Sequence, residues 1–178
     1  MNMSELPIIK RAMLHRNSIA FKNESSEQTY QHLLDRSEQL AAQLLGNESD
    51  LNSATVAMFI PADSDFVSVQ WAIWRAGRIM LPLCLSATQP VWEYSLSDSN
   101  TSIVITTQEL KNEIIDLCNK LNVRLLVIES HHKKKEIVLP TIKNSRPAMI
   151  LYTSGTTNKP KGVLTTHANI EAQIESLV

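Results

Sequence analysis

The chain alternates between short, continuously apolar runs and longer stretches in which apolar residues recur every three or four positions. The short runs predict strands that are buried on both faces, and the longer stretches predict amphipathic helices. The expected strands are 55–60, 79–83, 102–106, 124–129, 148–152 and 162–166. The expected helices are 30–45, 63–75, 89–97, a helix with its core face over 110–121, and 168–178. Residues 131–145 are expected to be mostly loop.

Local signals indicate where several of these helices begin and end. Gly46 and Gly77 follow the first two helices and suit a helix C-terminus. Asp63 is suited to cap the second helix. Thr106 and Glu109 have the spacing of a capping box, which predicts that the fourth helix begins directly after the strand that precedes it.

The order of the elements predicts the fold class. Strands that alternate with helices, and that are apolar throughout, are typical of βαβ units. We therefore expect an α/β fold with a mostly parallel sheet covered by helices. The length of 178 residues suits a single α/β domain, 1–178, and the 43% hydrophobic and 20% charged fractions are ordinary for a globular chain.

Charge and composition narrow the function classes. The net charge is −1 and no basic stripe is visible, so no nucleic-acid partner is expected. No apolar run reaches the ~18 residues of a membrane span, so no transmembrane segment is expected and a cytoplasmic location is the default. Cys84 and Cys118 are far apart, which favours two buried or partly buried thiols over a disulfide. The basic run 131–135 is interpreted as a solvated loop, not a metal or anion patch.

One polar segment, 152–162, differs from everything around it. It reads Tyr-Thr-Ser-Gly-Thr-Thr-Asn-Lys-Pro-Lys-Gly. Gly155 allows close approach of the backbone to a ligand, and Asn158 is the next-best residue for a left-handed turn. Lys159 and Lys161 bring positive charge. Small residues, hydroxyls, free N–H groups and lysines are together suited to surround a chain of phosphates.

The position of the segment supports this interpretation. It follows an apolar strand, so it should lie at the carboxyl end of a sheet strand, where open α/β sheets bind ligands. It is not a Walker A loop, which requires Gly-Lys-Ser/Thr leading into a helix, because Gly162 leads into the extended 163–166. A kinase-type G-x-G-x-x-G is also missing. A flexible linker is the competing interpretation, but linkers rarely join two strands so directly.

Other residues are interpreted as structural. Trp71 and Trp74 lie three positions apart on an expected helix, for which core packing is the default and an acyl tunnel or subunit contact the alternative. His167 suits either a helix start or a ligand contact. Asp98 is expected to be a surface charge. No Ser/His/Asp arrangement indicates a hydrolase.

The segment Tyr-Thr-Ser-Gly-Thr-Thr-x-x-Pro-Lys-Gly-Val closely resembles the phosphate loop of the adenylate-forming superfamily of acyl-CoA synthetases, adenylation domains and luciferases. The resemblance implies an ATP-dependent, AMP-forming ligase in which a carboxylic acid becomes an acyl-adenylate and then an acyl-CoA. It implies ATP with Mg²⁺, and CoA as co-substrate. The ATP-contacting candidates carried over are Thr153, Ser154, Gly155, Thr156, Thr157 and Lys161. Asn158 departs from the family's usual Gly, which puts the tightness of ATP binding in doubt.

Three further segments, 67–85, 93–105 and 163–170, also resemble segments of this family. Segment 93–105 matches at Glu93, Tyr94, Asp98 and Ser99. Among the branches, malonyl-CoA synthetases look most similar, which implies malonate or methylmalonate as the acid, with a fatty acid as the alternative. The sequence leaves the acid and the oligomeric state open.

Members of this family are roughly three times longer, as several domains require. The chain therefore resembles the N-terminal part of the large domain, without the C-terminal lid domain and its adenylation lysine. We expect these 178 residues to be catalytically incomplete on their own, so no catalytic or metal-binding residue is assigned. The rival hypothesis is a truncated homologue that only binds a nucleotide or a partner. An unrelated P-loop NTPase is disfavoured by the missing Gly-Lys-Ser/Thr.

Overall fold

The computed structural model describes residues 6–23, 27–128, 138–153 and 160–177. The helices are α1 (Pro7–Leu14), α2 (Tyr30–Leu45), α3 (Ser64–Arg75), α4 (Gln89–Asp98), α5 (Lys111–Leu121) and α6 (His167–Glu175). The strands are β1 (Ile19–Lys22), β2 (Glu27–Thr29), β3 (Thr55–Phe59), β4 (Ile79–Pro82), β5 (Thr101–Thr106), β6 (Arg124–Val127), β7 (Pro147–Thr153) and β8 (Lys161–Thr166). Every strand and helix expected over 30–128 and 147–177 is present, with ends shifted by a few residues.

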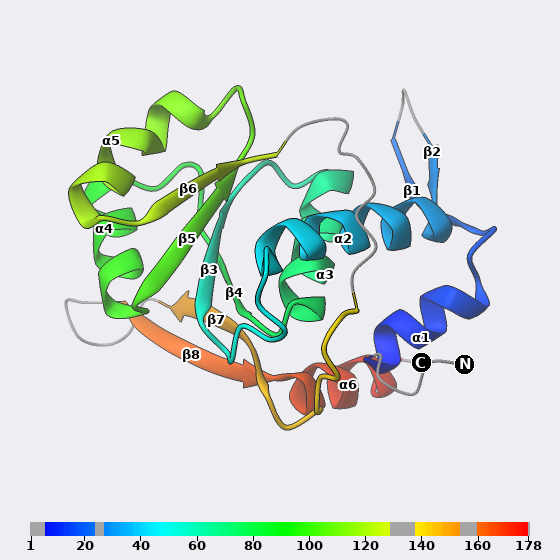
Figure 1. Ribbon diagram of the computed structural model, residues 1–178. Helices are drawn as coiled ribbons and strands as arrows, with labels where there is room; N and C mark the ends of the chain where they lie inside the picture. Colours follow the sequence, from blue (N-terminus) through cyan, green and yellow to red (C-terminus); the bar gives the residue numbers. More distant parts are fainter. Residues whose placement is uncertain (1–5, 24–26, 129–137, 154–159, 178) are drawn as a thin grey trace.

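The main sheet has the strand order β6-β5-β3-β4-β7-β8. The first five of these strands run parallel, and β8 returns antiparallel to β7. Figure 1 shows α2 and α3 on one side of this sheet and α4 and α5 on the other. The predicted fold class, an α/β fold with a mostly parallel sheet covered by helices, is confirmed.

Strand β3 explains why helices cover both faces of the sheet. Its side chains are all buried, and they alternate between two apolar clusters. Val56 and Met58 pack with α2 and α3, whereas Ala57 and Phe59 pack with α4 and α5. A strand without a polar face can only be stable between two covering layers. Trp92 of α4 meets Phe59 edge-on, with ring centroids 4.8 Å apart, which fixes α4 against the strand.

The helix ends follow the sequence signals with one exception. The side chain of Asp63 accepts the backbone N–H groups of residues 65 and 66, as a cap should. The predicted capping box of Thr106 and Glu109 is wrong. Thr106 is the buried last residue of β5, and its hydroxyl donates to the carbonyl of Phe59 instead. The helix α5 begins later, at Lys111, without a side-chain cap.

Two further expectations meet different outcomes. Cys84 is exposed and Cys118 is buried, so the expectation that both thiols are at least partly buried is wrong for Cys84. The described part of the expected loop, 138–145, contains no helix or strand, as predicted, but Ile142 is buried in the core cluster.

The chain before α2 forms structure that the sequence pattern did not predict. Helix α1 packs on α2, and β1 pairs with β2 as a two-stranded antiparallel sheet. Arg11 of α1 forms an ion pair with Glu171 of α6, so the two ends of the described chain lie side by side. Figure 1 shows α1 and α6 next to each other, near both chain ends.

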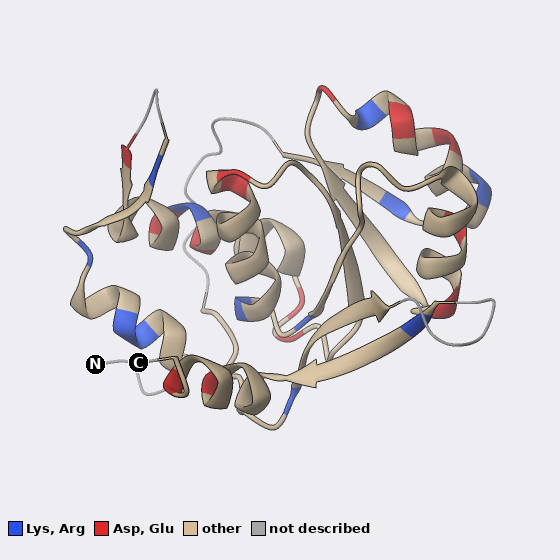
Figure 2. Cartoon of the chain, turned by 180° about the vertical axis from the view of Figure 1, so that it is seen from behind, with Lys and Arg blue, Asp and Glu red and all other residues tan. Residues whose placement is uncertain are grey.

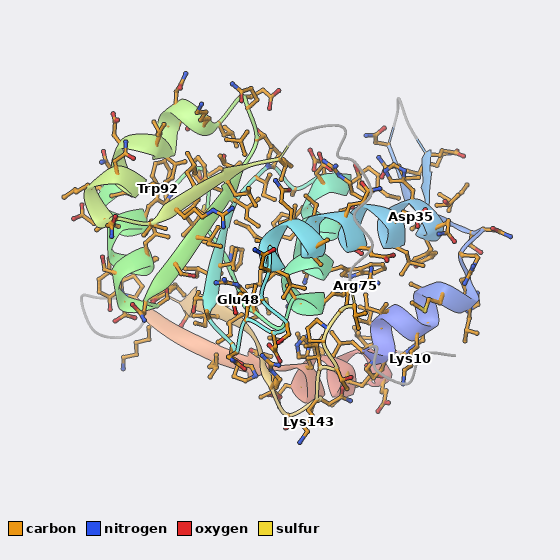
Figure 3. The ribbon with its side chains drawn as sticks, in the orientation of Figure 1. Lys10, Asp35, Glu48, Arg75, Trp92 and Lys143 are labelled. Carbon is orange, nitrogen blue, oxygen red and sulfur yellow. The ribbon has the colours of Figure 1, made fainter. Side chains whose placement is uncertain are left out.

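Charged residues of both signs are interspersed along the chain (Figure 2), in agreement with the balanced composition. Among the charged residues, Arg75 at the end of α3 is buried (Figure 3). Its guanidinium donates to the carbonyl of Leu34 and to the hydroxyl of Ser37, both in α2. Within the described ranges, no helix has the length and apolarity that crossing a membrane would require.

The turn between α3 and β4 is fixed by an ion pair. Arg146 donates to both carboxylate oxygens of Asp50, at 2.6 and 3.0 Å, and to the carbonyl of Gly77 at 2.6 Å. These hydrogen bonds hold the pKa of Asp50 below its usual range. Gly77 has φ of +77°, and a Cβ there would lie 2.4 Å from the Asp50 carboxylate. The start of β7 is thereby tied to the start of β4.

Gly77→Ala should therefore destabilise the protein more than Gly46→Ala. Gly46 also has positive φ, at +59°, but a Cβ there meets no atom within 4 Å. We expect a loss of about 2 kcal/mol for Gly46→Ala, from backbone strain alone, and about 2 kcal/mol more for Gly77→Ala, where the added Cβ also clashes with Asp50. Urea unfolding of both variants measures the difference. Equal losses would contradict the packing described around Asp50.

Candidate nucleotide-phosphate site

The two ends of the predicted phosphate loop lie at the tip of the β7–β8 pair. Thr153 is the last residue of β7 and Lys161 is the first residue of β8, and the two are paired across the strands. Both side chains are exposed. Because β7 runs parallel to β4, this tip lies at the carboxyl end of a parallel strand, as the sequence predicted. The other candidates, Ser154, Gly155, Thr156 and Thr157, lie outside the described residues, as does Asn158.

A tyrosine anchors the end of β7. The hydroxyl of Tyr152 donates a 2.6 Å hydrogen bond to the carboxylate of Asp98, at the end of α4. Burial, together with this carboxylate, raises the pKa of the Tyr152 phenol, so the group remains a neutral donor. Asp98 was predicted to be a surface charge, and it is exposed, but it also serves as the acceptor that holds Tyr152.

A second tyrosine, Tyr94 of α4, contacts the chain just before β8. The hydroxyl of Tyr94 donates to the carbonyl of Pro160 at 3.2 Å. The rings of Tyr94 and Tyr152 meet edge-on, with centroids 6.0 Å apart. Helix α4 therefore contacts the chain on both sides of the loop. We call Tyr94, Asp98 and Tyr152 the tyrosine clamp.

Gly162 leaves room for the clamp. It is paired with Tyr152 across the β7–β8 strands. A Cβ at this position would lie 3.1 Å from the side chain of Ile150 and 3.3 Å from the Tyr152 ring. Those contacts are tighter than ordinary van der Waals separations, so a larger residue would press the ring away from Asp98. Glycine is used here for close approach, and not for a left-handed backbone.

The remaining candidates, Trp71, Trp74 and His167, are buried and pack against other side chains. Trp74 is buried, its indole N–H donates to the carbonyl of Ala148 in β7, and its ring meets that of His167 edge-on at 5.5 Å. Burial and the charge of Arg146 lower the pKa of His167 to about 4, so its imidazole is neutral near pH 7. His167 thus packs at the first position of α6. Trp71 is also buried and stacks on Tyr30. The interpretation of the tryptophans as core residues is confirmed.

The described end of the site fits a phosphate chain. Lys161 supplies a cation and Thr153 a hydroxyl, and both face solvent at the same tip. Exposed groups of this kind, on a rigid strand pair, can contact phosphate oxygens without prior rearrangement of the sheet. No group of three or more His, Cys, Asp or Glu residues that could hold a metal ion occurs among the residues with described positions.

Comparison with known proteins defines the class. The family model for AMP-binding enzymes matches residues 9–178, so the chain belongs to the AMP-binding enzyme family. Among curated relatives, the malonate–CoA ligase ACSF3 of Xenopus laevis is 36% identical over 97% of this chain and 32% of its own length. The human protein of the same name is 32% identical, again over 97% of this chain and 32% of its own length. The chain thus spans about a third of the length of these relatives.

Solved structures share the fold. An o-succinylbenzoate–CoA synthetase from Bacillus subtilis, in complex with AMP, has a TM-score of 0.84 and 22% identity, over 97% of this chain and 45% of that one. Apo MatB from Rhodopseudomonas palustris has a TM-score of 0.80 and 20% identity, over 96% of this chain and 36% of that one. The match to the N-terminal part of the adenylate-forming fold is confirmed.

The clamp is the part of the site that sequence reasoning missed. The segment 93–105 resembles the family at Tyr94 and Asp98, but the sequence itself shows no reason for these two residues. The reason is a contact over 54 positions, from Tyr152 to Asp98, and another over 66, from Tyr94 to Pro160. A pattern of neighbouring residues does not reveal such distant pairs.

Tyr152→Phe should loosen the β7–β8 tip without unfolding the chain. The variant loses one hydrogen bond to a charged acceptor, so backbone amides of residues 161–164 should exchange with solvent about tenfold faster. Hydrogen exchange read by NMR measures this. Tyr30→Phe is the matched control, because the Tyr30 ring stacks on Trp71 in a different part of the molecule. Unchanged exchange in β8 of Tyr152→Phe would contradict the clamp.

Proposed function

We propose that this chain is the phosphate-binding portion of an AMP-forming acid–CoA ligase that acts on malonate or a related small dicarboxylate. The observation that carries the proposal is the location of the loop's described ends, Thr153 and Lys161, at the carboxyl end of a parallel strand. The malonate–CoA ligases, at 32 and 36% identity, support the choice of acid over a fatty acid.

In the proposed reaction, Lys161 would stabilise negative charge. A carboxylate oxygen of the acid would attack the α-phosphorus of ATP, the bond to the bridging oxygen would break, and acyl-adenylate and pyrophosphate would result. The thiol of CoA would then displace AMP. The leaving pyrophosphate gains negative charge in the first step. The Lys161 ammonium, at the loop end, is suited to stabilise that charge electrostatically.

The clamp would serve this step by limiting the motion of the loop ends. Catalysis of phosphoryl-type transfer depends on positioning and charge stabilisation more than on covalent help from the protein. Tyr152 and Tyr94 fix the strands that carry Thr153 and Lys161. Binding of the acid and of CoA, and the thioester step, require groups that we do not assign to these 178 residues. The cytoplasmic location stays a prediction, because the ACSF3 relatives are named as mitochondrial.

Malonate-dependent exchange of labelled pyrophosphate into ATP tests the proposal. The protein for this assay is the product of the complete reading frame that contains the chain. We expect exchange with malonate to exceed exchange with octanoate. We also expect Lys161→Ala to lower the malonate-dependent rate by at least about tenfold, since one lost contact to a developing charge has an effect of this order or larger.

Lys143→Ala is the matched control for this assay. Lys143 is also exposed, but Figure 3 shows it near α6, away from the tip of β7 and β8. Its variant should exchange at the wild-type rate. No exchange with any acid would instead favour a protein that only binds a nucleotide or a partner. Equal rates for Lys161→Ala and wild type would remove Lys161 from the phosphate site.

A further inference from the structure

A crevice lies at the carboxyl ends of β3 and β5, whereas the phosphate loop follows β7. Strands β3 and β5 are neighbours, but the chain leaves β3 through α3 and leaves β5 through α5. Helix α3 belongs to one apolar cluster and α5 to the other, so the two connections depart to opposite faces of the sheet. Such a divergence at the carboxyl ends of parallel strands opens a crevice, and open α/β sheets bind ligands there.

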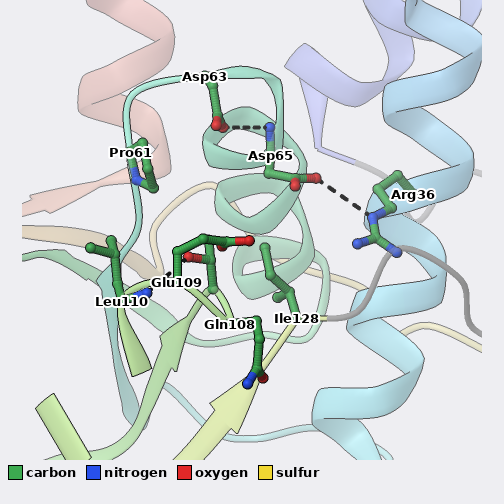
Figure 4. A pocket seen from close by; sticks show the side chains of 9 residues that line it. Arg36, Pro61, Asp63, Asp65, Gln108, Glu109, Leu110 and Ile128 are labelled. Carbon is green, nitrogen blue, oxygen red and sulfur yellow. Dashed lines mark hydrogen bonds and ion pairs between the residues drawn. The ribbon is translucent and has the colours of Figure 1, made fainter. Parts of the chain in front are cut away.

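A cavity of about 630 Å³ occupies this crevice. Its walls come from the chain that follows β3, from the chain that follows β5, from the end of β6 and from α2. Figure 4 shows the side chains around it, with Pro61, Leu110 and Ile128 forming the apolar part of the lining. The volume lies within the range of small-molecule sites in proteins.

Among the described residues of the lining, negative charge is in excess. Asp63, Asp65 and Glu109 contribute three carboxylates to this described part, and Arg36 contributes one guanidinium. The Arg36 side chain is only 9% exposed, and its Nε lies 3.7 Å from the Asp65 carboxylate. One oxygen of Asp63 accepts N–H groups of the first turn of α3. The carboxylate of Glu109 is exposed.

The charges are distributed over two sides of the cavity. Asp63 and Asp65 belong to the start of α3, and Glu109 belongs to the segment after β5, with apolar Leu110 and Ile128 beside it (Figure 4). A ligand that complements this lining has a cationic group at each end and an aliphatic middle. An anion such as malonate or a nucleotide phosphate would meet repulsion from the same carboxylates.

We propose that this crevice, which we call the switch-point cavity, is a second ligand site that binds short aliphatic diamines. One ammonium group would lie against Glu109 and the other near Asp63 and Asp65, with the methylene chain over Ile128. Its described lining comes from α2, from the start of α3 and from the chain that follows β3, β5 and β6, and it includes neither Thr153 nor Lys161. The proposal goes beyond the ligase function and does not depend on it.

Calorimetric titration of the 178-residue chain with 1,4-diaminobutane tests the proposal. We expect saturable binding that weakens as the salt concentration rises. Glu109→Gln should weaken binding about fivefold, the size expected for one exposed charge pair, and Glu109→Lys should abolish it. Both changes lie at an exposed position, so both variants should fold. Glu48→Gln is the matched control at an exposed turn outside the cavity, and it should bind like wild type.

The uncharged analogue 1,4-butanediol distinguishes charge recognition from simple filling of the cavity, and it should not bind. Neither ATP nor a carboxylic acid is present in the titration, so a negative result leaves the role of the phosphate loop untouched. Non-saturable binding of the diamine would overturn the proposal. So would equal affinity in wild type and Glu109→Gln, or equal weakening by Glu109→Gln and Glu48→Gln.

Discussion

Burial of β3 on both faces is the constraint on which the rest of the structure depends. Its side chains alternate between two apolar clusters, so a layer of helices must cover each face of the sheet. One of these layers contains α4, held against Phe59 by Trp92. The position of α4 in turn places Tyr94 and Asp98 within hydrogen-bonding distance of Pro160 and Tyr152. The geometry at the tip of β7 and β8 is thus a consequence of packing in the centre of the sheet.

The proposed phosphate site depends on the same arrangement. Two side chains of one helix and one strand residue hold the two sides of the loop, through hydrogen bonds of 2.6 and 3.2 Å. These contacts involve Tyr152 and Pro160, which flank the loop. The small and polar residues of the loop sequence are therefore not needed for these contacts. Functional loops that are supported by contacts from the surrounding scaffold are common in α/β enzymes. The membership in the AMP-binding enzyme family fits this arrangement.

The sequence predicted most of the sheet, because β3, β4 and β5 are continuously apolar and are separated by recognisable helix signals. It failed where a residue's role depends on a distant partner. Thr106 fits a capping box locally, but its hydroxyl bonds to a carbonyl of the neighbouring strand. The number and spacing of the cysteines predict that Cys84 is at least partly buried, yet it is exposed just after β4 ends.

The candidate site shows the same division. The motif predicted that the loop follows a sheet strand, and the described ends, Thr153 and Lys161, lie there. The supporting role of Asp98 could not be predicted, since an acid on the polar side of a helix is usually only solvated. The crevice between β3 and β5 was also invisible in the sequence, because it depends on the order of strands in the sheet, and that order is fixed by packing across the whole chain.

We propose that the tip of β7 and β8 binds the phosphates of ATP. The most direct measurement is an NMR titration of the chain, with ATP and with AMP, that follows assigned backbone amides. We expect saturable shifts at Thr153 and at residues 161–163 with ATP, and smaller shifts at the same positions with AMP, which lacks the β- and γ-phosphates. Shifts of equal size with both nucleotides, or shifts confined to other parts of the chain, would contradict this proposal.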